Sequence, residues 1–285
     1  MYDAAVIGTG PAGLSAAINL KLHNKSFIWF GSCGFSEKVE KSEKIANYPG
    51  MGLVTGEELN RRFASHAQEM DITPLDKMVT NITAMRDRYM VLAENDIYEA
   101  KALLLCVGSV AAKGFPGEEA LLGKGVSYCA TCDGFLYKGK TIAVYCGAKR
   151  YEHEVAYLAE LAAKVWLYTP YQDSGISMPN VERLPRPIKQ VEGEGRVSGL
   201  TLTDGSIVPV DGFFCLRSAV APATLLPGLS MDGPHIVVDR GMRTNLPGCY
   251  AAGDCTGRPY QIAKAVGEGN TAAHSMIEYL AEQGG

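Results

Sequence analysis

The sequence predicts an α/β protein of two domains, with the second domain inserted in the first. Two segments, beginning at residues 2 and 141, each contain a short apolar strand, a turn and a helix. A third strand and helix near the C-terminus have no place in the second segment and are expected to complete the first domain. We therefore expect an outer domain of residues 1–113 and 244–285, and an inner domain of residues 114–243. The length of 285 residues suits two domains.

The predicted elements follow one another along the chain with turns between them. In the outer domain they are strand Tyr2–Ile7, helix Pro11–His23, strand Ser26–Phe30, helix Gly56–Glu69, strand Ala102–Cys106, strand Cys249–Ala252 and a helix at about Gln261–Ala281. In the inner domain they are strand Thr141–Tyr145, a helix near Tyr151–Ala163, and strands Lys164–Tyr168, Val197–Thr203 and Ile207–Val210. Short apolar runs bounded by turn residues favour buried parallel strands.

Composition argues against several classes of function. The formal net charge of −4 disfavours nucleic acid as a partner. No apolar run is long enough to cross a membrane, and the N-terminus lacks the features of a signal peptide, so a cytoplasmic protein is expected. The eight cysteines include one C-x-x-C pair, and the five histidines have no ligand-like spacing. We therefore expect no metal site.

A glycine-rich turn, Gly8-Thr9-Gly10-Pro11-Ala12-Gly13, connects the first strand to the first helix. Gly8 permits the tight turn, Gly10 lets the backbone approach a pyrophosphate, and Gly13 allows close packing of helix and strand. The free N–H groups of the helix start then face the phosphates. This pattern predicts a dinucleotide site. The second strand ends in Phe30-Gly31-Ser32 without an acidic residue for a ribose, so a strand–helix turn without a ligand stays an alternative.

Ala251-Ala252-Gly253-Asp254 is expected to contribute to the same site. An aspartate at a strand end, before a helix, suits a hydroxyl group of a ribityl chain, and that helix can direct its N-terminus at a flavin ring. The alternative role of Asp254 is a helix N-cap.

The stretch Cys129-Ala130-Thr131-Cys132-Asp133 points most directly to chemistry. Two thiols separated by two residues at a helix start can form a disulfide, and the helix dipole lowers the pKa of a thiol there. Thiolates are the nucleophiles and leaving groups of thiol–disulfide exchange. Asp133 could exchange a proton with the pair, or it could serve only as a first-turn carboxylate.

These motifs together resemble the bacterial low-molecular-weight thioredoxin reductases. The resemblance covers nearly the whole chain and depends on Gly8–Gly13, Asn47-Tyr48-Pro49-Gly50, Phe115-Pro116-Gly117-Glu118-Glu119, Val126–Asp133 and Ala251–Asp254. It implies a homodimeric FAD enzyme with two Rossmann-like dinucleotide-binding domains, each a three-layer ββα arrangement, the second inserted in the first. Its disulfide would take electrons from the flavin and pass them to thioredoxin.

The resemblance also implies roles for single residues. Cys132 would lie nearest the flavin, Cys129 would attack thioredoxin, and Asp133 would act as the acid. The residues expected to contact FAD are Gly8, Gly10, Pro11, Ala12, Gly13, Asn47, Pro49, Gly108, Gly253, Asp254, Gln261, Ile262 and Ala263. The last three replace the Arg-Gln-Ala pattern of the family. Tyr260 before them could stack on the flavin or cap the helix.

The inner domain departs from the family where NADPH should bind. The family's G-x-G-x-x-A/G turn reads Cys146-Gly147-Ala148-Lys149-Arg150-Tyr151, and Tyr151 is expected to project into the place of the pyrophosphate. The family's His-Arg-Arg, which pairs with the 2′-phosphate, reads Tyr168-Thr169-Pro170, with no cation. Two lost phosphate contacts of about 1.5–3 kcal/mol each would weaken binding by roughly two to four orders of magnitude.

The chain is therefore most similar to the ferredoxin-dependent flavin thioredoxin reductases, which implies ferredoxin as the electron donor. Ferredoxins are generally acidic, so a basic docking surface is expected, with Lys21, Lys25, Lys38, Lys41 and Lys44 as candidates. Two alternatives stay open. One is the same disulfide chemistry with another donor, either an unusually bound pyridine nucleotide or a second flavin in the inner domain. The other is a flavoprotein that is no enzyme, such as a redox sensor.

Overall fold

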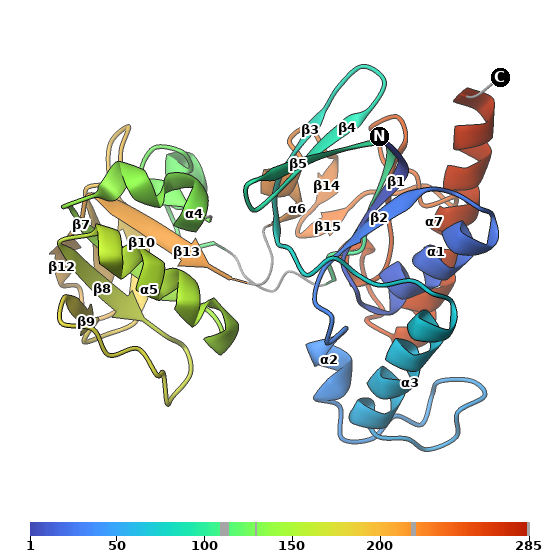
Figure 1. Ribbon diagram of the computed structural model, residues 1–285, viewed down its shortest axis with the longest axis horizontal. Helices are drawn as coiled ribbons and strands as arrows, with labels where there is room; N and C mark the ends of the chain where they lie inside the picture. Colours follow the sequence, from blue (N-terminus) through green and yellow to red (C-terminus); the bar gives the residue numbers. More distant parts are fainter. Residues whose placement is uncertain (109–113, 129, 218–220, 284–285) are drawn as a thin grey trace. The chain divides into compact units, whose positions relative to one another are not determined.

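The computed structural model describes residues 1–108, 114–128, 130–217 and 221–283, without the side chain of Cys132 (Figure 1). The chain forms two compact units, Met1–Ala111 with Pro222–Gly285, and Ala112–Ala221. The second unit is thus inserted in the first. The chain returns to the first unit at Pro222, about twenty residues before the predicted position.

The segment from 222 to 243 belongs to the first unit because its contacts lie there. It contains the short helix α6 (Pro222–Leu225) and a hairpin of β14 (Met231–Asp232) and β15 (His235–Ile236). Asn245 fixes it by accepting a hydrogen bond from the backbone N–H of Ser230 at 2.8 Å and donating one to the carbonyl oxygen of Gly228 at 2.8 Å. Elements of two to four residues are too short to give a periodic pattern.

The first unit is built on a mixed sheet in the order β2-β1-β5-β4-β3, in which β16 also pairs with β5. Its strands are β1 (Tyr2–Ile7), β2 (Phe27–Phe30), β3 (Val79–Ala84), β4 (Tyr89–Ala93), β5 (Asp96–Leu105) and β16 (Cys249–Ala251). β1, β2, β5 and β16 are parallel, and β3, β4 and β5 form an antiparallel meander. The turns after β1 and β16 therefore leave the same edge of the sheet, where such folds bind ligands.

Two helices of this unit, α1 (Pro11–Leu22) and α7 (Ile262–Gln283), lie side by side (Figure 1). Small residues make the contact possible: a Cβ at Gly269 would lie 2.1 Å from the carbonyl oxygen of Ala12. Two further helices are α2 (Glu37–Glu40) and α3 (Gly56–Glu69), which has the predicted bounds.

The second unit contains a parallel sheet in the order β6-β13-β7-β8-β9 and an antiparallel sheet in the order β10-β11-β12. The parallel strands are β6 (Val126–Ser127), β7 (Thr141–Cys146), β8 (Lys164–Tyr168), β9 (Val181–Arg183) and β13 (Gly212–Leu216). The antiparallel strands are β10 (Ile188–Glu192), β11 (Gly199–Leu202) and β12 (Ile207–Pro209). The helices are α4 (Ala130–Asp133) and α5 (Glu152–Leu161).

Alternate residues of the parallel sheet face two different cores. Ile142 and Val144 pack with α5, whereas Ala143 and Phe213 pack with residues of the antiparallel sheet. The second unit therefore has the three-layer ββα arrangement. The predicted α/β class is confirmed, since both units combine parallel strands with helices. No helix among the described residues is both long and apolar enough to span a bilayer.

Candidate functional site

The glycine-rich turn after β1 has the geometry that the sequence predicts. Gly8 has φ +114°, and a Cβ there would lie 2.2 Å from the carbonyl oxygen of Cys106. A Cβ at Gly13 would lie 1.9 Å from the carbonyl oxygen of Gly8. At Gly10, in contrast, no atom of the described chain lies within 4 Å of such a Cβ. The protein itself needs Gly8 and Gly13, whereas Gly10 leaves space for something outside the chain.

The start of α1 is open to an anion. Gly10 is its N-cap and makes no side-chain hydrogen bond, Pro11 is its first residue, and its first turn carries no acidic side chain. The free N–H groups and the partial positive charge of a helix start favour phosphate. Trp29 fixes the turn beneath them, since its Nε1 donates to the carbonyl oxygen of Gly8 at 2.8 Å. These residues fit the pyrophosphate of a dinucleotide.

Residues predicted to lie near a flavin ring come together from distant parts of the chain. Asn47 Nδ2 donates to Gln261 Oε1 at 2.7 Å, although the two residues are 214 positions apart. Both side chains are exposed, as are those of Pro49 and Ala263. Ile262, in contrast, is partly buried against the cluster of Val39, Ile45 and Leu59. Gly108 follows β5 at the same sheet edge with φ +71°.

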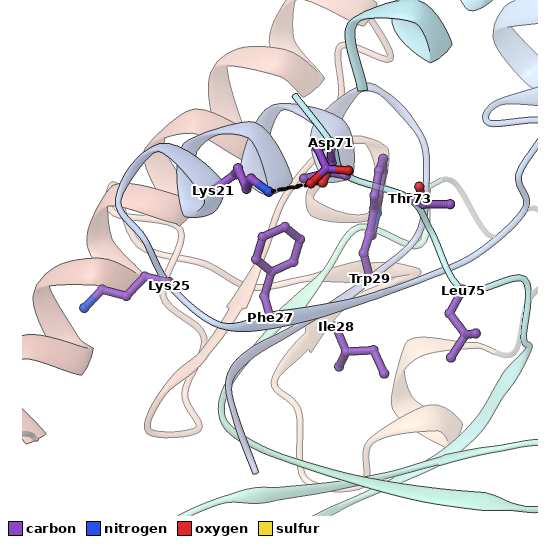
Figure 2. Close-up of a pocket in the computed structure, with 9 residues that line it drawn as sticks. Lys21, Lys25, Phe27, Ile28, Trp29, Asp71, Thr73 and Leu75 are labelled. Atoms are coloured by element: carbon purple, nitrogen blue, oxygen red, sulfur yellow. Dashed lines mark hydrogen bonds and ion pairs between the residues drawn. The ribbon is translucent and has the colours of Figure 1, made fainter. Parts of the chain in front are cut away.

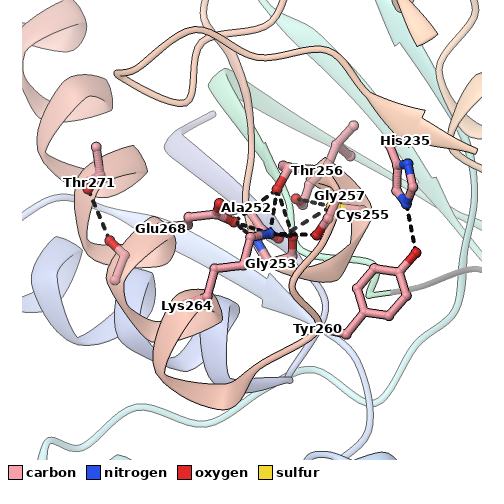
Figure 3. A network of polar contacts seen from close by, with 12 residues as sticks. His235, Ala252, Gly253, Cys255, Thr256, Gly257, Tyr260, Lys264, Glu268 and Thr271 are labelled. Atoms are coloured by element: carbon pink, nitrogen blue, oxygen red, sulfur yellow. Dashed lines mark hydrogen bonds and ion pairs between the residues drawn. The ribbon is translucent and has the colours of Figure 1, made fainter. Parts of the chain in front are cut away.

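Asp254 is bound to a cation. Its Oδ2 accepts a hydrogen bond from Lys38 Nζ at 2.5 Å. Gly253 is the residue that caps the short helix of residues 254–256, so Asp254 is not an N-cap. Lys38 Nζ also lies 5.1 Å from the ring centroid of Tyr260, whose hydroxyl is 2.7 Å from His235 Nε2 (Figure 3). His235 belongs to the segment that the sequence assigned to the inner domain, so its contact with Tyr260 was not predicted.

The turn after β16 carries a second polar network that sequence reasoning missed (Figure 3). Lys264 and Glu268 of α7 pair at 3.0 Å and bind the backbone of Gly253. Their spacing of four residues on a predicted helix was the available signal, because such positions face one another.

Cys129 lies outside the described residues, and so does the side chain of Cys132. Around them, Ser127 Oγ donates to Asp133 Oδ2 at 2.6 Å. Cys132 and Asp133 belong to α4, which has four residues. A single helical turn supplies only a small part of a macrodipole, so the dipole argument made from the sequence is weak here. Immediately beyond, Phe135 is 62% exposed and Leu136 is 51% exposed.

Most other cysteines are unsuited to thiol chemistry. Cys106, Cys146, Cys215, Cys249 and Cys255 are buried free thiols. Burial raises the pKa of Cys249 and that of Cys255 to about 12 each, so these thiols stay protonated at neutral pH and are poor nucleophiles. Cys33, in contrast, is an exposed free thiol.

The inner-domain turn after β7 is occupied by the protein's own side chains. Tyr171 donates its hydroxyl to Glu152 Oε1 at 3.0 Å, and the same hydroxyl lies 3.3 Å from Cys146 Sγ. The backbone N–H of Gly175 donates to Glu152 Oε2 at 3.3 Å. Glu152 is the first residue of α5. A carboxylate therefore stands at the helix start where a nucleotide phosphate would bind.

The predicted position of the Tyr151 side chain, in the place of the pyrophosphate, is wrong. Its side chain is buried in the core with Val155 and Leu158 and does not project into the phosphate position. The cause is a 3-10 turn over Lys149–Tyr151, which delays the start of α5 to Glu152 and rotates Tyr151 inward. Obstruction of this turn comes from Glu152 and Tyr171 instead.

A buried ion pair lies at the same edge of the parallel sheet, after the neighbouring strand β13. Arg217 follows β13 directly, and its guanidinium binds the carboxylate of Glu118, whose side chain is 2% exposed. The Arg217 guanidinium also lies 5.9 Å from the ring centroid of Tyr145 on β7. Glu118 accepts further hydrogen bonds from the Tyr128 hydroxyl at 2.7 Å and from the Phe115 N–H at 2.8 Å. Arg217 is thereby neutralised beside β7 and β13, the strands that border the nucleotide crevice of such a sheet.

A cation lies near the end of β8, although the sequence directly after this strand contains none. Arg183 of β9 reaches it and donates from Nη1 to Thr169 Oγ1 at 3.1 Å. The stretch Tyr168–Pro170 itself contains no cation, but the pairing of β8 with β9 brings Arg183 beside it, which the sequence did not reveal.

The predicted basic surface is not continuous. Lys21 and Lys25 line a pocket of about 340 Å³ with Phe27 and Asp71, at the end of α1 opposite the glycine-rich turn (Figure 2). Lys21 pairs there with Asp71 at 3.5 Å. Lys38, in the segment near Asn47, pairs with Asp254. Lys21 and Lys38 are therefore each paired with a carboxylate, and they lie near opposite ends of α1. Within the described part of the chain, no cluster of side chains is suited to a metal ion.

Three comparisons with known proteins agree on the kind of protein that carries such a site. The chain matches the family model described as pyridine nucleotide-disulphide oxidoreductase over residues 2–165 and 180–269. It is 31% identical to the thioredoxin reductase of Listeria monocytogenes, a match that covers 99% of this chain and 95% of that protein. The crystal structure of a ferredoxin-flavin thioredoxin reductase from Clostridium acetobutylicum is similar with a TM-score of 0.93 and 42% identity, over 99% of this chain and 98% of that one. The atypical thioredoxin reductase TRi of Desulfovibrio vulgaris Hildenborough is 31% identical, with a TM-score of 0.68 and 99% of each chain covered.

Proposed function

Because this chain belongs to the pyridine nucleotide-disulphide oxidoreductases, and within them is a thioredoxin reductase that carries FAD, we propose that its electrons come from reduced ferredoxin. They then pass through FAD to the Cys129–Cys132 disulfide and on to thioredoxin. The observation that carries the proposal is the helix start after β7 in the second unit, where the carboxylate of Glu152, bonded to Tyr171 and Gly175, lies at the place of a nucleotide phosphate.

Two features of the second unit disfavour a pyridine nucleotide. Glu152 stands at the start of α5, held by Tyr171 and Gly175, and a carboxylate there repels the phosphate that the helix start would otherwise attract. After β13, Arg217 is committed to Glu118. Its charge is therefore not available to a phosphate, because taking it away from a buried carboxylate is strongly unfavourable.

We propose that FAD lies on the first unit, with its pyrophosphate at the Gly8–Gly13 turn and its ribityl chain at Asp254. Asn47 and Gln261, joined at 2.7 Å, would border the ring, with Pro49, Gly108, Ile262 and Ala263 around it. A bound flavin can accept electrons singly and deliver two together, which a one-electron donor requires.

For the second half of the reaction we propose that the reduced Cys129 thiolate attacks the disulfide of thioredoxin. One sulfur of thioredoxin leaves as a thiolate and takes a proton from Asp133, which Ser127 holds at 2.6 Å. Cys132 then attacks Cys129 in the mixed disulfide, which restores the Cys129–Cys132 disulfide. The proton of the Cys132 thiol passes to the second thioredoxin sulfur as it leaves, so that dithiol thioredoxin is released. The exposed Phe135 and Leu136 next to this helix offer an apolar surface for thioredoxin. A cytoplasmic homodimer, as the family resemblance implies, completes the proposal.

One observation favours NADPH as an alternative donor. Arg183 lies at the end of β8 beside Thr169, where the family binds the 2′-phosphate. For that function Tyr171 and Glu152 would have to leave the helix start together.

An anaerobic experiment distinguishes the donors. The oxidised protein is mixed with NADPH, with NADH and with chemically reduced ferredoxin in three separate experiments. In each, the absorbance band of the oxidised flavin is followed. We expect rapid bleaching with ferredoxin, and bleaching at least about 100-fold slower with either nucleotide. Rapid bleaching by NADPH would overturn the donor assignment. The Arg183→Ala variant is the control, because an NADPH site at β8 would then lose affinity.

A further inference from the structure

Two side chains of α7, Lys264 and Glu268, hold the turn that follows β16 (Figure 3). Glu268 Oε2 accepts hydrogen bonds from the backbone N–H of Gly253 at 2.8 Å and from the Thr256 hydroxyl at 2.9 Å. Lys264 Nζ donates to the carbonyl oxygens of Gly253 at 2.9 Å and of Gly257 at 2.8 Å. Both polar groups of the Gly253 backbone are therefore bound to α7.

Helix stability does not explain this pair. Lys264 is the third residue of α7, where the macrodipole disfavours a cation. A lysine placed before a glutamate is also the less favourable order for an i, i+4 pair. Yet the two side chains are only 17% and 18% exposed and lie 3.0 Å apart. The pair is stabilised instead by its hydrogen bonds to the polar groups of the turn.

The turn that they hold lies against the first turn of α1. A Cβ at Gly253 would be 3.1 Å from Cβ of Ala12, the second residue of α1. Gly253 has φ +91°, which a residue with a side chain adopts only with strain. The position of Asp254 relative to the glycine-rich turn is therefore set by this contact and by the two side chains of α7.

We propose that Lys264 and Glu268 are positioning residues for FAD: they fix residues 253–257 so that Asp254 and the Gly8–Gly13 turn contact the cofactor at the same time. The inference rests on the FAD placement proposed above and is independent of the electron donor. Gly253 then serves the site through its conformation, because its N–H is bound to Glu268.

The test is the release of FAD from the purified holoenzyme, measured as the rise in flavin fluorescence after dilution. The Lys264→Met variant keeps the length of the side chain, removes the bonds to the turn and leaves the Glu268 carboxylate unpaired. We expect release roughly 10- to 100-fold faster than from the wild type. The Lys264→Met/Glu268→Gln double variant removes the unpaired charge and keeps an oxygen that accepts from the Gly253 N–H. It should release FAD at least about threefold more slowly than Lys264→Met alone.

Lys21→Met is the matched control. Lys21 also forms an ion pair, with Asp71 at 3.5 Å, but at the far end of α1. Its FAD release should stay within about twofold of the wild type. Thermal unfolding with and without added FAD distinguishes a loss of FAD binding from a general loss of stability. Only weaker FAD binding reduces the rise in unfolding temperature that added FAD causes.

Three results would overturn the inference: FAD release from Lys264→Met within about twofold of the wild type, a loss that Lys21→Met shares, or a lower unfolding temperature with undiminished stabilisation by FAD. If Lys264→Met does not fold, Glu268→Gln alone serves, with an expected three- to tenfold faster release (about 0.7–1.4 kcal/mol). Rapid reduction by NADPH would defeat the donor proposal and leave this one intact.

Discussion

The Cys132→Ser variant is expected to reduce thioredoxin more than about a thousandfold more slowly than the wild type, while retaining its FAD. Without the second thiol, Cys129 has no partner with which to form the disulfide that receives electrons from the flavin. The mixed disulfide with thioredoxin also has no thiol to resolve it. Steady-state thioredoxin reduction and the flavin content of the purified variant measure the two parts of this prediction.

Cys33→Ser is the matched control for this variant. Cys33 is an exposed free thiol of the first unit, with its Sγ 3.7 Å from the carbonyl oxygen of Pro74. Its replacement should leave the rate of thioredoxin reduction unchanged. A Cys132→Ser enzyme that keeps a tenth or so of the wild-type rate would contradict the disulfide relay.

The Gly13→Ala variant is expected to lose FAD and about 3 kcal/mol of its unfolding free energy. Its new Cβ would lie 1.9 Å from the carbonyl oxygen of Gly8, so α1 must move away from β1 and the turn between them must change shape. Urea unfolding measures the stability, and the ratio of flavin to protein absorbance measures the loss of FAD.

Gly10→Ala separates the cofactor from the fold at the same turn. Since no atom of the described chain lies near its new Cβ, its unfolding free energy without FAD should change by less than about 0.5 kcal/mol. FAD should nevertheless bind more weakly, because the methyl group occupies the approach to the pyrophosphate. A Gly10→Ala protein with wild-type FAD affinity would contradict the assignment of this turn to the phosphates.

Much of the fold could be predicted from the sequence because its long elements have clear patterns. The strands Tyr2–Ile7 and Lys164–Tyr168 and the helix Gly56–Glu69 have the predicted bounds. The return to the first unit at Pro222 was missed, because α6, β14 and β15 are stabilised by contacts with distant residues and not by their own periodicity.

The candidate site was predictable only where one motif contains the chemistry. The steric roles of Gly8 and Gly13 follow from their spacing, and a Cβ at either position would overlap the backbone. The role of Gly10 depends on a bound pyrophosphate and stays a prediction. The bond between Asn47 and Gln261 depends on tertiary packing, which no local pattern reveals. The obstruction of the turn after β7 was expected from Tyr151 but comes from Glu152 and Tyr171, because Tyr151 ends a 3-10 turn and packs into the core.

The central claim is that ferredoxin electrons reach thioredoxin through this chain and nicotinamide electrons do not. Its most direct test is the number of thioredoxin thiols formed anaerobically by catalytic amounts of the protein, counted with a thiol reagent. With reduced ferredoxin as the sole reductant, we expect one thioredoxin dithiol for every two ferredoxin molecules oxidised, and formation more than about a thousandfold slower when Cys132→Ser replaces the wild type. Stoichiometric formation of thioredoxin dithiol from NADPH, at a rate equal to that with ferredoxin, would contradict it.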